Sequence, residues 1–140
     1  MKINYDSPTG KSTNQPIRKM YKISKEFSFS AAHSLFGLHD DHPCSRLHGH
    51  NYVVTVHLRA KELNPQGFVR DYNELRMVKS YIDGTLDHRN LNDILAPLNS
   101  SAENIAKMIY DRFKSQLPEL YAVEVSETPK TSAIYEPECE

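Results

Sequence analysis

The stretch that decides the fold is FSFSAAHSLFGLHDDHPCSRLHGHNYVVTVHL, residues 27–58. At its start Phe27, Phe29, Ala31 and His33 alternate with small residues, which is the period-two pattern of a half-buried strand. His33 therefore shares a strand face with the two aromatic side chains.

The same alternation resumes at the other end of the stretch, where His48, His50, Tyr52 and Val54 share one face. If the two runs pair as an antiparallel hairpin, His33 ends one strand where His48 and His50 begin the other. Three imidazoles would then meet at the loop end of the hairpin. Three protein ligands with a fourth position left open are typical of a catalytic zinc, whereas a structural zinc is usually closed by four. The pattern predicts a metal site here.

Composition limits the possible classes of protein. The 140 residues suit one domain, and a formal net charge of -1 with mixed charges argues against electrostatic binding of nucleic acid. The only cysteines are Cys44 and Cys139, so no disulfide framework is indicated and a reducing cytoplasm fits best. No apolar run approaches the length of a membrane span, and the N-terminus lacks the apolar core of a secretory signal. We expect a cytoplasmic protein without a membrane partner.

The chain divides into an arm and one domain. Residues 1–20 are polar and predict a flexible N-terminal arm, which leaves residues 21–137 as the single domain. The first two strands are expected at about 21–33 and 48–60. The connection between them, residues 34–47, is longer than an ordinary hairpin turn, and loops of that length often carry function.

Two helices and a second hairpin follow. Asp71 and Glu74 form a capping-box pattern that predicts the first helix, and Ser100 and Glu103 form a second one. The order is therefore ββααββ, an α+β fold in which two helices cover one face of a four-stranded antiparallel sheet. The apolar positions at helical spacing are Leu75, Val78, Ile82 and Leu86 in the first helix, and Ala102, Ile105, Ala106, Ile109 and Phe113 in the second. The residues that alternate in the third strand are Tyr121, Val123, Val125 and Glu127, and the fourth strand ends near Tyr135.

Cys44 precedes His48 by four residues and lies close to any metal held there. A neighbouring cation lowers the pKa of a thiol, so Cys44 could serve as a thiolate that transfers protons. The C-x3-H-x-H spacing equally allows it to be a fourth zinc ligand. A third interpretation is that Cys44 is an inert cysteine in the loop.

Two further features could carry chemistry. Asp87 beside His88 could set the tautomer of the imidazole and raise its basicity, although a solvated loop pair is the simpler interpretation. Glu127 falls on the apolar face of its strand, where an unpaired carboxylate is costly. It therefore needs a cation or the N–H groups of a ligand, unless the strand end lets it reach water.

Taken together, these motifs resemble one protein family. FSAAH, C-x3-HGHNY, V-x-DY, LDHRNLN, the Ser-x-Glu-Asn helix start and V-x-V-S-E-T-P are similar to those of the 6-pyruvoyl-tetrahydropterin and 6-carboxytetrahydropterin synthases. The likeness covers about residues 21–136. Within the family, C-x3-HGH is more like the bacterial carboxytetrahydropterin branch, because the animal pyruvoyl enzymes more often have C-x5-HGH.

The resemblance implies the tunnelling fold, in which ββααββ subunits form trimers and two trimers stack as a homohexamer. It implies that zinc is held by His33, His48 and His50, that Cys44 is the catalytic thiol with Asp87 and His88 as proton-relay partners, and that Glu127 anchors the pterin. The chain departs from the family in its polar arm and in the cluster His39, Asp40, Asp41 and His42, which could add or compete as metal ligands.

The resemblance implies the function of a zinc lyase that converts 7,8-dihydroneopterin triphosphate to 6-carboxy-5,6,7,8-tetrahydropterin, acetaldehyde and triphosphate, on the route to queuosine and other 7-deazapurines. The nearest alternative is a 6-pyruvoyl-tetrahydropterin synthase, which eliminates triphosphate but keeps the side-chain carbons. Two other classes stay open: a non-catalytic module stabilised by a four-ligand zinc, and a zinc hydrolase using metal-bound hydroxide.

Overall fold

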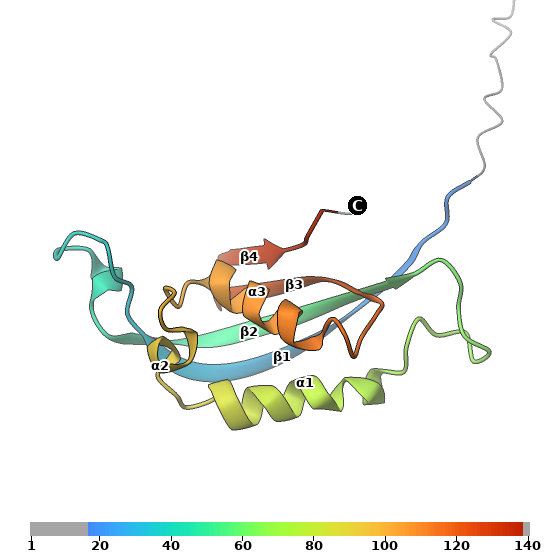
Figure 1. Cartoon of the computed structure of the whole chain (residues 1–140), viewed down its shortest axis with the longest axis horizontal. Coiled ribbons are helices and arrows are strands. Elements are labelled where there is room, and N and C mark those ends of the chain that lie inside the picture. The colour runs from blue at the N-terminus through green and yellow to red at the C-terminus, as the bar shows by residue number, and fades with distance from the viewer. Residues whose placement is uncertain (1–16, 139–140) are drawn as a thin grey trace, which may run out of the picture.

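The computed structural model describes residues 17–138. Its sheet has four antiparallel strands in the order β1 (Tyr21–His33), β2 (His48–Ala60), β3 (Leu120–Thr128) and β4 (Thr131–Tyr135). Figure 1 shows the long β1–β2 hairpin running the length of the molecule. Most of the predicted arm, and Cys139, lie outside the described residues.

The β1–β2 hairpin has the predicted ends and register. Phe29 pairs with Tyr52, and His33 pairs with His48 at the last position before the loop. The prediction that His33 closes one strand where the other two histidines open the next is confirmed. The loop itself contains one short 3-10 turn, Pro43–Ser45.

The first helical segment is less regular than its apolar spacing predicts. It begins with a 3-10 turn (Tyr72–Leu75), continues as α1 (Arg76–Tyr81) and ends in a π-helical turn (Ile82–Leu86). Asp71 caps it as predicted, accepting a hydrogen bond from the Asn73 amide at 2.9 Å. Glu74 does not complete a capping box, because its carboxylate pairs with Arg70.

The second predicted helix is α3 (Ala102–Phe113), and its cap differs from the prediction. The N-cap is Ser101, whose hydroxyl accepts from the Asn104 amide at 3.2 Å, and not Ser100. The backbone oxygen of Ser100 accepts a hydrogen bond from His33, and its hydroxyl donates one to Asn92. A short helix, α2 (Leu91–Leu95), was missed, because five residues give no helical periodicity to read.

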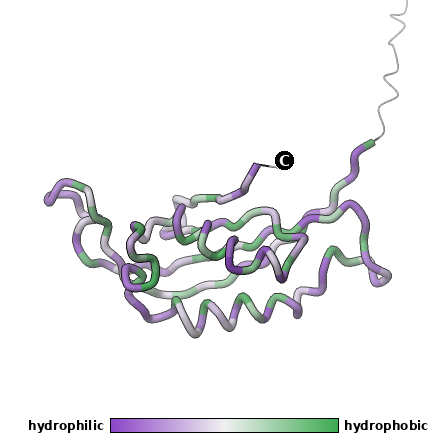
Figure 2. The backbone as a smooth tube through the Cα atoms, viewed as in Figure 1, coloured by the Kyte–Doolittle hydropathy of each residue, from purple (hydrophilic) through white to green (hydrophobic). Residues whose placement is uncertain are grey.

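The core lies between the sheet and the helices. Figure 1 shows α3 crossing β3 and β4 and α1 running along β1, and Figure 2 shows hydrophobic and hydrophilic residues alternating along these elements. This is the predicted α+β arrangement, with α2 as a small addition. The fully buried large side chains include Tyr52, Leu58, Leu75, Ile82, Leu86, Leu91, Ile105, Ile109, Leu117 and Leu120.

The loop after α1 returns to the sheet beside the hairpin end. The amide of Ala32 donates to the Arg89 carbonyl at 3.0 Å, and Ala32 forms a parallel bridge with Asn90. This contact covers the outer edge of β1 only where the strand approaches His33. Over residues 17–138, none of the helices has the length and apolarity to cross a membrane.

Candidate metal centre

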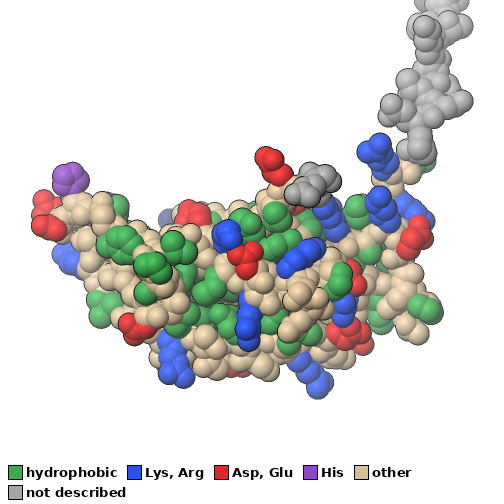
Figure 3. Space-filling model, in the orientation of Figure 1, with side chains coloured by type: hydrophobic (Ala, Val, Ile, Leu, Met, Phe, Trp, Pro, Cys, Tyr) green, Lys and Arg blue, Asp and Glu red, His purple; other side chains and the backbone are tan. Residues whose placement is uncertain are grey.

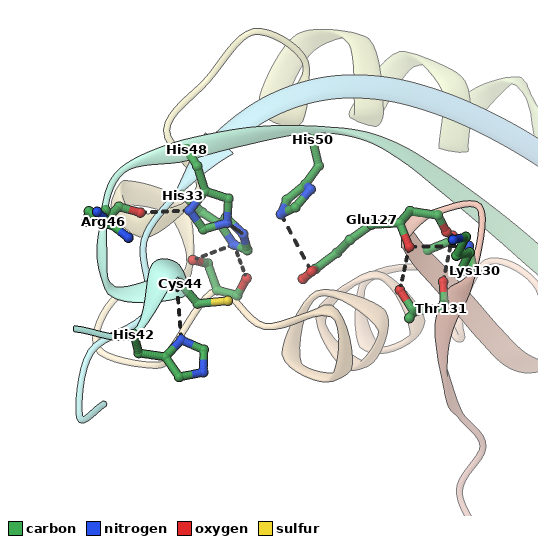
Figure 4. Close-up of polar contacts among 12 residues, drawn as sticks. His33, His42, Cys44, Arg46, His48, His50, Glu127, Lys130 and Thr131 are labelled. Atoms are coloured by element: carbon green, nitrogen blue, oxygen red, sulfur yellow. Dashed lines mark hydrogen bonds and ion pairs between the residues drawn. The ribbon is translucent and has the colours of Figure 1, made fainter. Parts of the chain in front are cut away.

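The three predicted histidines converge. One ring nitrogen from each of His33, His48 and His50 lies within 4.8 Å of the others, and these are the side chains that could share a metal ion among the residues described. Figure 4 shows all three projecting from the end of the hairpin. They come together because β1 and β2 place them on one face at adjacent positions of the register.

Two of the rings are oriented by backbone carbonyls. His33 Nδ1 donates to the Ser100 carbonyl and His48 Nδ1 to the Arg46 carbonyl, both at 2.7 Å. A carbonyl only accepts, so each Nδ1 carries the proton and each Nε2 presents a lone pair. This is the outer-shell arrangement that fixes metal-binding histidines.

The spacing of these lone pairs suits zinc. The Nε2 atoms of His33 and His48 are 3.0 Å apart. Nitrogen ligands around a tetrahedral zinc are about 3.3 Å apart, given Zn–N bonds of about 2.0–2.1 Å. Two facing lone pairs at this distance repel unless a cation lies between them. The residues therefore fit a three-histidine zinc site with an open position.

Glu127 faces the third histidine, as Figure 4 shows. Its Oε2 lies 3.6 Å from Nε2 of His50, and that nitrogen is buried without a hydrogen bond. Glu127 stands on the core side of β3 as predicted and is half-buried, with a quarter of its side chain exposed. It also borders a cavity of about 250 Å³ between the start of α3 and the β3–β4 hairpin.

The surroundings keep His50 neutral. Burial is the largest cause that lowers the pKa of its imidazole, and the nearby His33 and His48 lower it further, while the charge of Glu127 acts in the opposite direction. A neutral imidazole is the form that binds a metal. The lowered pKa therefore favours the form of His50 that can act as a metal ligand.

Figure 4 shows Cys44 near His33 and His48, and its thiol is not grouped with the three converging histidines. It belongs to the turn Pro43–Ser45, and its carbonyl accepts from the Leu35 amide at 2.8 Å, which ties the loop to the chain just after His33. Its thiol is half-buried and free, and it is not among the groups that converge on the common point. This arrangement favours a separate thiol over a fourth ligand.

The polar cluster in the same loop stays apart from the metal site. His39, Asp40, Asp41 and His42 are all exposed, and none of them joins a metal-binding group among the residues described. His42 instead accepts a hydrogen bond from the Cys44 amide at 3.1 Å. Figure 3 shows acidic and histidine side chains gathered at this tip of the molecule, in solvent.

Asp87 and His88 form the predicted pair, with Oδ2 and Nδ1 2.9 Å apart. The Ser30 amide donates to Asp87 Oδ1 at 2.9 Å, and this bond, followed by the bond from His88, lowers the pKa of the Asp87 carboxyl. His88 has a φ of 57°, an uncommon backbone conformation for a residue with a side chain. Its ring is 83% exposed and borders a cavity of about 480 Å³ that His50 also lines, and the pair makes no hydrogen bond to Cys44.

Sequence reasoning missed the residues that support His33. Asn92, in α2, accepts from the Ser34 amide at 3.0 Å and from the Ser100 hydroxyl at 2.8 Å, and it donates to the Ser34 carbonyl. Asn92 thus holds the segment after His33 against the carbonyl that orients the His33 ring. The sequence carries no signal for such a link, because its partners are 58 and 8 residues away.

Comparisons with known proteins identify the family of this chain. The model of the 6-pyruvoyl tetrahydropterin synthase family matches residues 22–138. The chain is 36% identical to the 6-carboxy-5,6,7,8-tetrahydropterin synthase of Synechocystis sp., over 83% of this chain and 93% of the relative. It is also 36% identical to the human 6-pyruvoyl tetrahydrobiopterin synthase, over 84% and 92%.

A solved structure shares the fold. The 6-pyruvoyl tetrahydropterin synthase of Caenorhabditis elegans superposes with a TM-score of 0.75 at 34% identity, covering 86% of this chain and 97% of that one. The family match covers all of β1 except Tyr21, the other three strands, the three helices and the candidate site residues. On these grounds the chain belongs to the 6-pyruvoyl tetrahydropterin synthase family and has its tunnelling fold.

Proposed function

We propose that the protein is a zinc-dependent 6-carboxytetrahydropterin synthase. It converts 7,8-dihydroneopterin triphosphate and one water to 6-carboxy-5,6,7,8-tetrahydropterin, acetaldehyde and triphosphate, as a step in the biosynthesis of queuosine and other 7-deazapurines. The observation that carries the proposal is the convergence of the three histidines, two with Nδ1 bonded to a carbonyl, beside a carboxylate that borders a cavity.

A zinc ion held by His33, His48 and His50 would act as a Lewis acid toward the hydroxyl and carbonyl oxygens of the substrate side chain. Cys44, on the turn Pro43–Ser45 near these histidines, is the proposed thiolate that removes a proton from the side chain. Asp87 and His88 supply the second acid or base. The carboxylate of Asp87 accepts from His88 Nδ1 and so leaves Nε2 of that ring to exchange protons.

Glu127 is the anchor for the pterin ring in this proposal. A carboxylate that borders a cavity can accept hydrogen bonds from an amino group and a ring N–H side by side, which is the donor pattern a pterin offers. The apolar lining beside it includes Leu35, Ala102 and Val125, which suits a flat aromatic ring.

Product analysis tests the proposal. Zinc-loaded protein is incubated with 7,8-dihydroneopterin triphosphate, and the pterin products are identified by mass spectrometry. We expect 6-carboxy-5,6,7,8-tetrahydropterin together with acetaldehyde. Release of inorganic phosphate from simple phosphate esters, with no change in the pterin, would instead support a zinc hydrolase.

The second candidate is a 6-pyruvoyl-tetrahydropterin synthase. It is favoured by the equal identity, 36%, to relatives bearing each of the two names. The C-x3-HGH spacing of Cys44 and His48 supports the carboxy product. The same assay separates the two, because the pyruvoyl product retains the two carbon atoms that would leave as acetaldehyde.

We further propose that the subunits assemble as a homohexamer, a dimer of trimers, in the cytoplasm. Within the described chain β1 and β4 are the edge strands of the sheet, and most of β1 has no partner on its outer side. Ile134 on β4 and Tyr21 on β1 expose apolar surface at these edges. Light scattering on the eluted protein measures the mass, and a monomer would contradict the assembly.

A further inference from the structure

The hydroxyl of Tyr52 is buried without a partner. Tyr52 has no exposed surface, and its ring stacks on Phe29 with centroids 4.8 Å apart. The rings of His33 and His50 meet it edge-on at 5.8 and 5.5 Å. No hydrogen-bond partner for its hydroxyl exists among the residues described. A buried hydroxyl without a partner costs free energy that a phenylalanine would avoid, so a partner is expected in the working state of the site.

Tyr52 and Glu127 lie one position beyond the last paired residues of β2 and β3. Val53 pairs with Ser126 in the β2–β3 register, so the next position places Tyr52 opposite Glu127. Opposed residues of neighbouring strands project from the same face with Cβ atoms about 4.5–5.5 Å apart.

The present partner of Glu127 is His50, and that contact is weak. The two atoms are 3.6 Å apart, which is too long for a hydrogen bond. Nε2 of His50 could donate a hydrogen bond to the carboxylate only if this nitrogen carried a proton. If this nitrogen uses its lone pair as a metal ligand, as in the proposed function, it has no proton to give.

The carboxylate then needs another donor inside the protein. The buried side-chain atoms without a partner are His50 Nε2, His57 Nε2 and the Tyr52 hydroxyl, among those described. His57 belongs to the opposite face of β2, where it contacts Glu124 and Tyr121. Tyr52 is the remaining donor on the face that carries Glu127.

We propose that Tyr52 is a positioning residue whose hydroxyl donates a hydrogen bond to one carboxylate oxygen of Glu127. The other oxygen is then held toward the cavity, where it accepts from the N–H groups of the substrate. The full burial of Tyr52 excludes direct contact with a substrate and leaves Glu127 as the group through which it acts. The inference rests on the proposed function, because it takes His50 as a metal ligand and Glu127 as the pterin anchor.

A double-mutant cycle in zinc-loaded protein without substrate tests the hydrogen bond. Tyr52→Phe should lower the melting temperature in the wild-type background, since it removes the donor. In the Glu127→Ala background the same change should have no effect or raise the melting temperature, because the hydroxyl has no acceptor there. Tyr81→Phe is the control, since Tyr81 packs on Phe113 far from the site and its effect should be equal in both backgrounds.

Equal effects of Tyr52→Phe in the two backgrounds would overturn the proposal. So would a loss of zinc from Tyr52→Phe, because Tyr52 would then support the histidine rings and not the carboxylate. Both readouts require only folded, metal-loaded protein.

Substrate binding gives the second test. Titration with 7,8-dihydroneopterin should show about threefold to tenfold weaker binding to Tyr52→Phe, the loss of one modest hydrogen bond. KM should rise more than kcat falls. If the wild-type protein binds no pterin, the proposed function fails, but the double-mutant cycle still tests the hydrogen bond between Tyr52 and Glu127. If pterin binds equally to wild type and variant, the positioning role alone is wrong.

Discussion

The three histidines of the candidate metal centre differ in what surrounds their rings. His33 is fixed by the carbonyl of Ser100, just before α3, and His48 by the carbonyl of Arg46 in the loop. His50 has no such carbonyl and faces Glu127. Since two rings are fixed in advance and the third is neutral near pH 7, the site is arranged to receive a metal with little rearrangement.

The first prediction concerns the ligands. The purified protein should carry about one zinc per chain, and His48→Ala should lose most of it, because two histidines give a weak site. Metal analysis of the desalted protein measures this. His39→Ala is the matched control, since His39 is exposed in the loop and lies outside the metal-binding group. Full zinc content in His48→Ala would show that the ligands are wrongly assigned.

The second prediction concerns the pterin anchor. Glu127→Gln should keep fold and zinc but weaken pterin binding about tenfold to a hundredfold, because a charge-assisted acceptor is lost and a donor faces the donors of the pterin. Fluorescence titration with a pterin measures the affinity. Glu124→Gln removes the same charge from the opposite face of β3 and should leave the affinity unchanged. Equal affinities for all three proteins would make Glu127 a structural residue.

At the scale of residues, the sequence predicts side chains on shared faces but not their backbone partners. The convergence of the three histidines follows from strand alternation and the pairing of the two strands as a hairpin. The carbonyls of Ser100 and Arg46 could not be predicted, because any residue supplies a carbonyl and only the folded chain decides which one is near.

At the scale of elements, strands were predicted better than helices. The bounds of β1 and β2 match the prediction, because more buried and more exposed residues alternate along most of the 13 residues of each strand. The first helix was predicted as one regular element because Leu75, Val78, Ile82 and Leu86 face the core whether the turn is 3-10, α or π. Tyr121 was expected on the apolar face, yet it contacts His57 on the other face, because a register shift lies beside it.

The segment after α1 attaches Asp87 to the sheet, and this attachment makes stability depend on pH. The pKa of Asp87 is lower in the folded protein than the ordinary 3.8, first through the bond from the Ser30 amide. A lowered pKa contributes stability that is present above the ordinary value and is lost as the pH falls through the folded value.

The third prediction follows from that sign. Asp87→Asn should be less stable than wild type at pH 7, and the difference should shrink as the pH is lowered below about 3.8. Urea unfolding at several pH values measures it. Asp41→Asn, which changes an exposed carboxyl in the loop, should show no such convergence. A constant difference for Asp87→Asn across the whole range would mean that its ionised form is not what the Ser30 amide stabilises.

At the scale of the whole molecule, the chemistry is concentrated at one end. The hairpin end, its loop and the start of α3 meet there, as Figure 1 shows, and the metal centre, Cys44 and Glu127 lie among them. The long hairpin and the helices behind it form the apolar core that holds this end in place. We propose a division of roles at this end, in which three histidines hold the metal and a separate thiol moves a proton.

Cys44→Ala tests this claim most directly when zinc content, melting temperature and turnover of 7,8-dihydroneopterin triphosphate are measured on one preparation. The account predicts nearly unchanged zinc and melting temperature, with turnover about 100-fold to 10,000-fold lower, the usual contribution of a positioned acid or base. A ligating cysteine would instead lose zinc and stability first, with activity falling only in proportion to the missing metal. Zinc-replete Cys44→Ala with wild-type turnover would contradict the account.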